Sequence, residues 1–214
     1  CIRLKDDVQL FMDDVTVEDC VRGNEGAGIK IDAGASASIA NSVFYNNRTT
    51  SNDKEGGHIY TQGSLTVSNT SFDGGYADFG GAIYAETATA AVDIDNCDFT
   101  DNSAGTRGGS LYMFNGATLD MDGGTFNGDG TTALTGNDGG AVYLNTATHT
   151  IDDVDIIDIV SGDDAAIYSN HATLTLTNCD FTNTGDTATM DAGGALRAED
   201  GTLNVIGGSF THWS

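Results

Sequence analysis

The feature that most constrains this chain is a short phrase that recurs along its length: a Gly pair, a small residue, an aliphatic residue, and then an aromatic or basic residue. The copies read GGHIYTQ from Gly56, GGAIYAE from Gly80, GGSLYMF from Gly108, GGAVYLN from Gly139 and GGALRAE from Gly193. A second phrase follows each copy, as in LTVSNTSF (65–72) and VDIDNCDF (92–99). With degenerate copies, units of 25 to 30 residues cover the chain. A repeat of that length predicts a solenoid.

Both phrases alternate apolar and polar residues, which is the pattern of a β-strand. The aliphatic residue after each Gly pair is expected to face the core. The residue after it is expected to face outward, because Lys and Arg substitute for Tyr there. The aligned aliphatic residues are Leu4, Ile29, Ile59, Ile83, Leu111, Val142, Ile167 and Leu196, and in the first unit Lys5 takes the outward place.

A turn position follows the second strand of every unit. It is occupied by Asp14, Asn41, Asn69, Asn96, Gly123, Asp153, Asn178 and Gly207. These residue types tolerate a positive φ angle, so a left-handed bend is predicted at each. Coils of three short strands then stack into an all-β, right-handed parallel β-helix with about eight coils and roughly 28 residues per coil. Residues 1–214 are expected to form a single parallel β-helix domain that belongs to a longer chain or an assembly, because an uncovered end coil leaves backbone groups unpaired.

The pairing of GGA[ILV] with FxxN, seen here as FYNN (44–47) and FTDN (99–102), resembles the repeats of the chlamydial polymorphic outer membrane proteins and similar β-helical surface proteins. Other copies depart from FxxN and read FDGG, FNGD and FTNT. The resemblance implies a secreted adhesin or surface-layer component and no catalysis. The motif is informative about architecture and much less so about activity.

The net charge excludes some partners. The chain has 32 Asp and Glu residues against 8 Lys and Arg, which gives a formal charge of -24. Nucleic acids and anionic lipid surfaces bind through clustered cations, so neither is an expected partner. The sequence has no run of 18 apolar residues, and no membrane insertion is expected.

Two rows of outward side chains are candidate sites. The first is a ladder of tyrosines, predicted to be a solvent-facing contact surface: Tyr60, Tyr84, Tyr112, Tyr143 and Tyr168. The ladder either stabilises neighbouring strands or offers a flat platform for sugar rings or a neighbouring solenoid.

The second row is acidic and consists of Asp93, Asp95, Asp120, Asp122 and Asp152. Carboxylates on stacked strands lie about 4.8 Å apart and repel unless they are hydrated or bridged by a hard cation such as Ca²⁺. The row is therefore either a hydrated strip, a calcium site, or the carboxylate group of a polysaccharide lyase or hydrolase. A lyase would want a basic residue beside the carboxylates, and no Lys or Arg falls on this strand face.

The cysteines and one sequon complete the candidate residues. Cys97 and Cys179 take the same inward slot three units apart, which is beyond disulfide reach, so both are predicted to be buried free thiols. Cys1 and Cys20 begin and end the first coil, and a disulfide between them would fit an oxidising compartment. The sequon NRT makes Asn47 a candidate glycosylation site.

These observations lead to a functional hypothesis. We expect a non-catalytic structural or adhesive β-helix that is secreted or displayed on a cell surface and that self-associates head-to-tail through neighbouring coils at its ends, as in a filament. Two alternatives stay open: a carbohydrate-active lyase or hydrolase, and a calcium-dependent module that binds glycans through the acidic strip.

Overall fold

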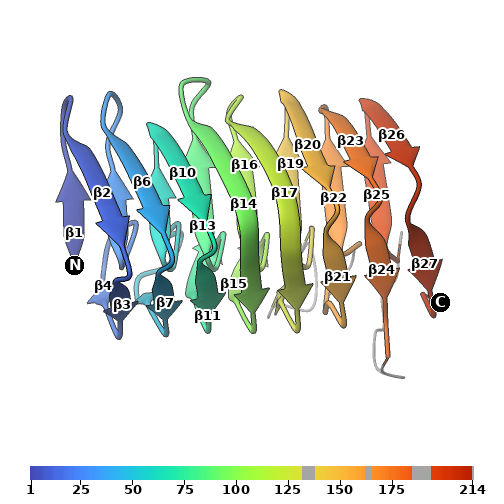
Figure 1. Cartoon of the computed structure of the whole chain (residues 1–214), viewed down its shortest axis with the longest axis horizontal. Coiled ribbons are helices and arrows are strands. Elements are labelled where there is room, and N and C mark those ends of the chain that lie inside the picture. The colour runs from blue at the N-terminus through green and yellow to red at the C-terminus, as the bar shows by residue number, and fades with distance from the viewer. Residues whose placement is uncertain (132–137, 162–164, 185–193, 214) are drawn as a thin grey trace.

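The computed structural model describes residues 1–131, 138–161, 165–184 and 194–213. The described chain folds entirely into β-strands and connecting turns, and the strands stack in parallel into a long rod (Figure 1). The predicted parallel β-solenoid is thereby confirmed. Register partners such as Ile2 and Ile29, or Leu65 and Val92, lie 27 residues apart, which is the length of one turn at these places. No helix in the described residues is long and apolar enough to cross a membrane.

Sheet 1 stacks one strand from each unit and corresponds to the phrase after the Gly pair. Its strands, in spatial order, are β1 (Ile2–Leu4), β5 (Ile29–Ile31), β9 (Ile59–Thr61), β13 (Ile83–Glu86), β16 (Leu111–Phe114), β19 (Val142–Asn145), β22 (Ile167–Asn170) and β25 (Leu196–Glu199). The order along the rod is the order along the chain, so each turn contacts only its neighbours.

Sheet 2 corresponds to the second phrase and bends at the predicted turn position. Before the bend lie β2 (Gln9–Asp13), β6 (Ser36–Ala40), β10 (Ser64–Ser68), β14 (Ala91–Thr100), β17 (Thr118–Asn127), β20 (Thr148–Asp152), β23 (Thr173–Thr177) and β26 (Thr202–Ile206). After it lie β3 (Thr16–Glu18), β7 (Val43–Tyr45), β11 (Ser71–Asp73), β21 (Asp155–Ile157), β24 (Asp180–Thr182) and β27 (Ser209–Thr211), while β14 and β17 run through the bend.

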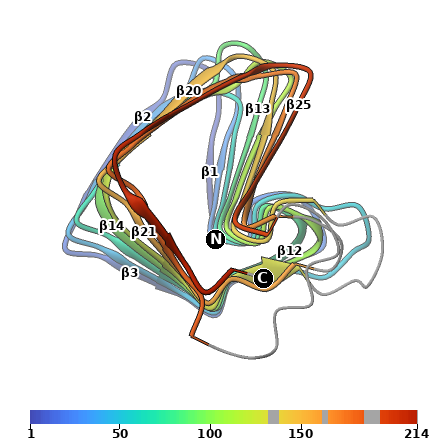
Figure 2. The same cartoon turned by 90° about the vertical axis from the view of Figure 1, so that its right-hand side faces the viewer.

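Sheet 3 is a short sheet that the coils of three strands predicted from the sequence do not include. It contains β4 (Val21–Arg22), β8 (Arg48–Thr49), β12 (Tyr76–Phe79), β15 (Ser103–Arg107) and β18 (Gly130–Thr131). A further bend leads into it, where Asp19, Asn46 and Asp101 have φ angles of 53°, 51° and 52°. Viewed along the rod, the turns superpose, and the limb that carries β12 curls back beside the base of sheet 1 (Figure 2).

The predicted bends are confirmed by the backbone angles. All eight turn positions after the second strand have positive φ, from 46° at Asn69 to 71° at Gly207. The first Gly of the pair needs its lack of a side chain as well. At Gly56, which has a φ of 66°, a Cβ would lie 2.2 Å from the carbonyl oxygen of Ile59. Gly193, which opens the last Gly pair, lies outside the described residues.

The alignment of the first unit is wrong by two residues. In the structure Ile2 pairs with Ile29 and Arg3 pairs with Lys30, where the sequence alignment had placed Leu4 and Lys5. The N-terminal amine of Cys1 donates to the carbonyl oxygen of Ala27 at 2.8 Å, which agrees with this register. The first unit has no Gly pair that could have fixed its register.

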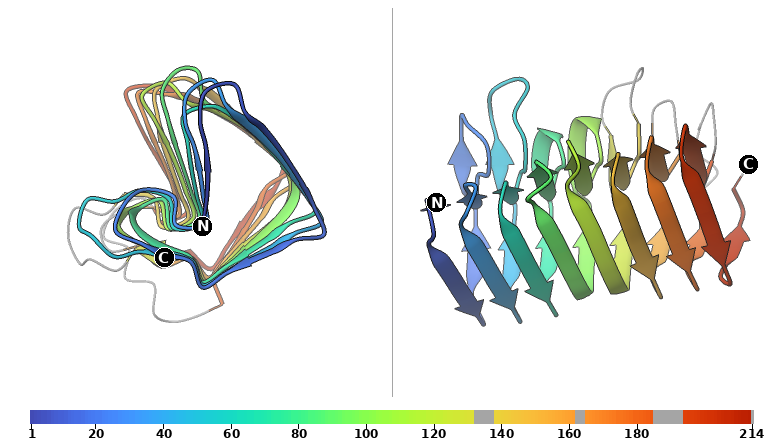
Figure 3. Two further views of the ribbon diagram at one scale, coloured as in Figure 1. Left: turned by 90° about the vertical axis from the view of Figure 1, so that its left-hand side faces the viewer. Right: turned by 90° about the horizontal axis from the view of Figure 1, so that it is seen from above.

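The core lies between sheets 1 and 2, where inward side chains stack from turn to turn. Phe44, Phe72, Phe99 and Phe126 form a column of rings whose centroids are 5.0, 4.9 and 4.9 Å apart. Cys97 and Cys179 are buried free cysteines, as predicted. The column continues at the other end of the rod with Phe181, whose ring stacks on Phe210 at 4.8 Å. Two further views show the same succession of strands from the N-terminus to the C-terminus (Figure 3).

Candidate binding groove on sheet 2

The acidic residues lie on the outer face of sheet 2 in register. Asp93 pairs with Asp120, and on the next row Asp95, Asp122 and Asp152 are successive partners. They line an open groove of about 700 Å³. Hydroxyl side chains complete its walls on both sides along the rod: Thr66, Ser68, Thr150, Thr175 and Thr177.

Local sequence explains why this face is polar and regular. Alternation on β14 sends Val92 and Ile94 inward, with exposures of 2% and 1%, so Asp93 and Asp95 must point outward. Parallel register then repeats this arrangement on each neighbouring strand about 4.8 Å away. The outcome is a lattice of carboxylates and hydroxyls on a rigid sheet, in which Thr150 donates a hydrogen bond to Asp120 across the strands.

The groove lies on a sheet whose charged side chains are acidic, whereas the basic residues in strands lie on the other two sheets. No strand of sheet 2 contains a Lys or an Arg, whereas β14 alone contributes three aspartates. The basic residues in strands belong to sheets 1 and 3, for example Lys30 in β5 and Arg107 in β15. The groove therefore favours cationic or neutral ligands rich in hydrogen-bond donors and disfavours anionic ones.

The structure brings together only part of the predicted calcium site. The carboxylates of Asp122, Asp152 and Asp153 offer ligand oxygens that all lie within 4.8 Å of one another. Asp93, Asp95 and Asp120 line the same groove but do not belong to this trio. The sequence analysis treated Asp153 as a turn residue and missed it, although its place directly after Asp152 and after a bend was the available signal.

Within the trio, one oxygen has no hydrogen-bond partner. Asp152 Oδ1 is inaccessible to solvent, and no donor among the described residues reaches it. Three carboxylates at this separation repel one another in the absence of a cation. The donor set, all carboxylate oxygen, is the type that hard cations such as Ca²⁺ prefer.

The prediction of a solvent-facing tyrosine ladder is wrong. The five tyrosines do point away from the core between the sheets, and they form a cluster of their own, but their exposures are only 3–5%. Phe79 and Phe114 pack against them. Arg107 lies over the ring of Tyr143 at 5.3 Å, and the Tyr60 hydroxyl donates to Glu86 at 2.7 Å. The ladder is a second, smaller core and offers no open platform for a ligand.

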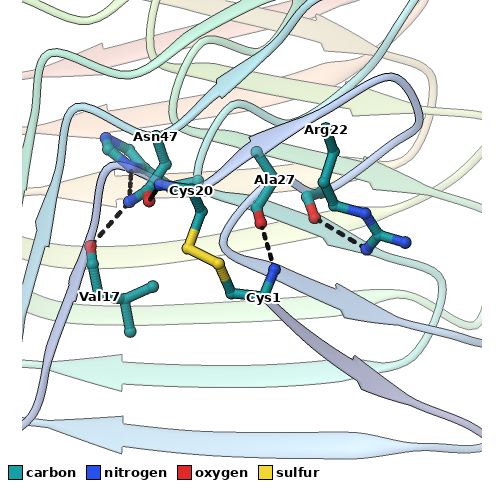
Figure 4. Close-up of a disulfide and its surroundings, with 8 residues drawn as sticks. Cys1, Val17, Cys20, Arg22, Ala27 and Asn47 are labelled. Atoms are coloured by element: carbon teal, nitrogen blue, oxygen red, sulfur yellow. Dashed lines mark hydrogen bonds between the residues drawn. A yellow bond between two sulfur atoms is a disulfide. The ribbon is translucent and has the colours of Figure 1, made fainter.

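A disulfide joins Cys1 to Cys20, with 5.9 Å between their Cα atoms (Figure 4). It ties the start of β1 to the turn between β3 and β4. The backbone N–H of Cys20 also donates to the side chain of Asn47 in the next turn, at 2.9 Å. The first turn is thus held both covalently and by hydrogen bonds to its neighbour.

The structure contradicts glycosylation of Asn47. Its side chain is 0% exposed, and its amide nitrogen donates to the carbonyl oxygen of Val17 at 2.8 Å (Figure 4). The same nitrogen lies 2.9 Å from Nδ1 of His58. A nitrogen that makes two buried contacts is closed to a glycosyl donor, so Asn47 is a structural residue.

No protein-family model, curated protein or solved structure matches this chain at a significant level.

Proposed function

We propose that this protein is a non-catalytic adhesive rod that works outside the reducing cytosol and holds its ligand in the groove on sheet 2. The observation that carries the proposal is the register of Asp93 with Asp120 and of Asp95 with Asp122 and Asp152 on one rigid sheet. Such a surface presents fixed hydrogen-bond acceptors at a regular spacing. The chemistry suits the hydroxyl groups of a neutral glycan, each of which can donate to a carboxylate.

Two further observations support binding outside the cell and without turnover. Structural disulfides such as Cys1–Cys20 persist in oxidising compartments. The residues that line the groove are Asp, Ser, Thr, Ile and Met, with no Lys, Arg or His among them. A lyase would need a basic group beside the carboxylates, so the lining disfavours cleavage by a lyase. A hydrolase needs only a pair of carboxylates and would be recognised by the release of reducing ends.

A binding and turnover experiment tests this proposal. The protein would be incubated with neutral and acidic polysaccharides, with bound protein and new reducing or unsaturated ends measured in the same samples. We expect retention on a neutral polysaccharide and no new chain ends. The double variant Asp120→Asn/Asp122→Asn should weaken retention about tenfold or more, since a hydrogen bond to a charged group contributes about 1.5 kcal/mol.

Asp155→Asn is the matched control, because Asp155 is an exposed residue of sheet 2 outside the groove lining. Retention should be unchanged in this variant. Release of chain ends would show an enzyme, and an equal loss in the groove and control variants would refute the groove as the site.

The trio of Asp122, Asp152 and Asp153 supports a second candidate, a calcium-dependent form of the same binding. We expect the melting temperature to rise between chelator and millimolar Ca²⁺, because a bound cation stabilises the folded state and removes the repulsion. Asp153→Asn should abolish the rise and Asp155→Asn should keep it. A melting temperature that does not respond to Ca²⁺ removes the metal and leaves the groove proposal standing. Head-to-tail stacking of copies stays a prediction, which light scattering tests.

A further inference from the structure

A column of buried polar side chains runs inside the solenoid at the end of the FxxN phrase. Asn47, Asn102 and Asp129 take this position in their units, and each is 0% exposed. One unit has Gly75 there instead. His58, also 0% exposed, fills the space, because a Cβ on Gly75 would lie 2.5 Å from His58 Nε2. The order of side chains along the column is therefore Asn47, His58, Asn102 and Asp129.

Hydrogen-bond directions fix the protonation of one nitrogen of His58. The backbone N–H of Cys20 donates to Asn47 Oδ1 at 2.9 Å, which sets the orientation of that amide. The amide nitrogen of Asn47 then donates to the carbonyl oxygen of Val17 at 2.8 Å and faces His58 Nδ1 at 2.9 Å. Since an amide nitrogen only donates, His58 Nδ1 accepts and carries no proton.

The other nitrogen is fixed in the same way. The backbone N–H of Gly75 donates to Asn102 Oδ1 at 2.9 Å, so this oxygen is an acceptor, and His58 Nε2 lies 3.1 Å from it. His58 is thus neutral with its hydrogen on Nε2. Burial lowers its pKa to about 3, although the bond to Asn102 acts in the opposite sense. Its remaining neighbours include the uncharged rings of Phe44 and Phe72.

Asp129 lies on the far side of Asn102. Its Oδ1 accepts from the backbone N–H of Asn102 at 2.8 Å and from the amide nitrogen of Asn102 at 3.3 Å. Its Oδ2 is buried and has no hydrogen-bond partner among the described residues. An ionised carboxylate with an unpaired buried oxygen is costly. Burial raises the pKa of Asp129 to about 7, the Ser110 hydroxyl near the carboxyl group and the hydrogen bonds from Asn102 lower it, and the charge of Asp101 raises it.

We propose that folding moves one proton within this column, from His58 in the unfolded chain to Asp129 in the folded chain, with Asn102 bridging the two. In mildly acidic solution the unfolded chain carries an imidazolium and a carboxylate. The folded chain carries an imidazole and a carboxylic acid. The proton that His58 releases equals the proton that Asp129 binds, so the column buries no charge and takes no net proton from solvent.

The consequence is that two opposing pH dependences cancel. The pKa of His58 is lowered from 6.5, so its contribution to stability is complete above that pH and is lost as the pH falls toward 3. The pKa of Asp129 is raised from 3.8, so its contribution is complete at low pH and is lost as the pH rises toward 7. Between about pH 3.8 and pH 6.5 the two changes offset each other, so the contribution of the column to the free energy of unfolding does not vary with pH.

Difference measurements on two variants test the transfer. Unfolding in urea would be followed from pH 4 to pH 8 in the wild type, Asp129→Asn, His58→Gln and the double variant. Relative to Asp129→Asn, the wild-type unfolding constant should rise with pH between about 4 and 7, approaching tenfold per pH unit. Relative to His58→Gln, the wild-type unfolding constant should fall as the pH rises to about 6.5, by up to tenfold per pH unit. The double variant should run parallel to the wild type.

Asp129→Asn suits the site because Asn already occupies the equivalent position at Asn47 and Asn102. His58→Gln suits it because Gln keeps one hydrogen-bond acceptor and one donor. A flat difference profile for either single variant overturns the proposal. Asp101→Asn is the control for local charge and should move the Asp129 transition to lower pH without changing its slope. Nitrogen NMR of the wild type gives a readout that needs no variant. The His58 ring should stay neutral with hydrogen on Nε2 from pH 4 to pH 8, and titration near 6.5 would refute the transfer.

Discussion

Replacement of Phe99 by Ala should be among the most damaging single changes in this solenoid. Phe99 is 0% exposed, and its ring lies between those of Phe72 and Phe126 at 4.9 Å on each side. Truncation of a buried Phe costs about 3–5 kcal/mol, because it loses the transfer energy of the ring and leaves a cavity. Stacked rings above and below hold that cavity open, so we expect a cost of about 4 kcal/mol.

Phe210 provides a matched control at the same position of the repeat. It is 49% exposed and has one ring neighbour, Phe181. With half of the ring already in solvent, Phe210→Ala should cost about half as much or less, roughly 1–2 kcal/mol.

Urea denaturation followed by far-ultraviolet circular dichroism measures both variants, and an unchanged denaturant slope would show that the same cooperative unit unfolds. Equal losses at the two positions would refute the reasoning, because stability would then not depend on the number of neighbouring turns.

Three further outcomes are expected. Reduction of Cys1–Cys20, which closes a loop with a sequence separation of 19, should cost about 3 kcal/mol, measured as the shift in urea midpoint with and without reductant. Gly124→Ala should cost at least about 2 kcal/mol, because φ is 98° and the added Cβ meets a carbonyl oxygen at 1.9 Å, whereas Gly74→Ala, with nothing nearer than 3.9 Å, should cost less in the same assay. Asn47 should carry no glycan after expression in a eukaryotic secretory pathway, and an intact mass that includes a glycan there would contradict its burial.

Periodicity predicted the strands, their phase and the bends, because each of these depends on residues within one unit. Ile83 is buried in the main core and Tyr84 in the separate cluster, as alternation required. Alternation could not predict that other side chains cover the outer face of sheet 1, where the tyrosines lie. The residues that bury the tyrosines, such as Phe79 and Arg107, lie at the ends of sheet 3 strands, in segments whose length and sequence vary between units.

Asn47 illustrates the same limit at a single residue. The sequon is a local pattern of three residues, but the partners that decide the role of Asn47 are Cys20 and Val17, which are 27 and 30 positions away. The acidic trio was partly predictable, since register follows from the repeat. Asp153 was missed because a residue at a left-handed bend was given a conformational role alone, and its φ of 52° does not prevent its carboxylate from approaching Asp122 and Asp152.

The pair His58 and Gly75 shows how a solenoid tolerates a departure from its own repeat. In other units the slot of His58 holds a small residue, such as Ala82 or Ala141, and a buried polar residue follows at the FxxN position in some of them. In this unit His58 takes the slot that is small elsewhere, and Gly75 takes the Asn position. The imidazole therefore fills the space of the missing Asn side chain from a different part of the turn. A Cβ on Gly75 would meet the carbonyl oxygen of Gly81 at 2.4 Å as well as His58. Removal of His58 alone therefore does not make room for a side chain at position 75, because the carbonyl oxygen of Gly81 would still be in the way. The two departures are one structural feature, and it places a titratable imidazole in a slot that holds alanine in other turns, as at Ala82 and Ala141.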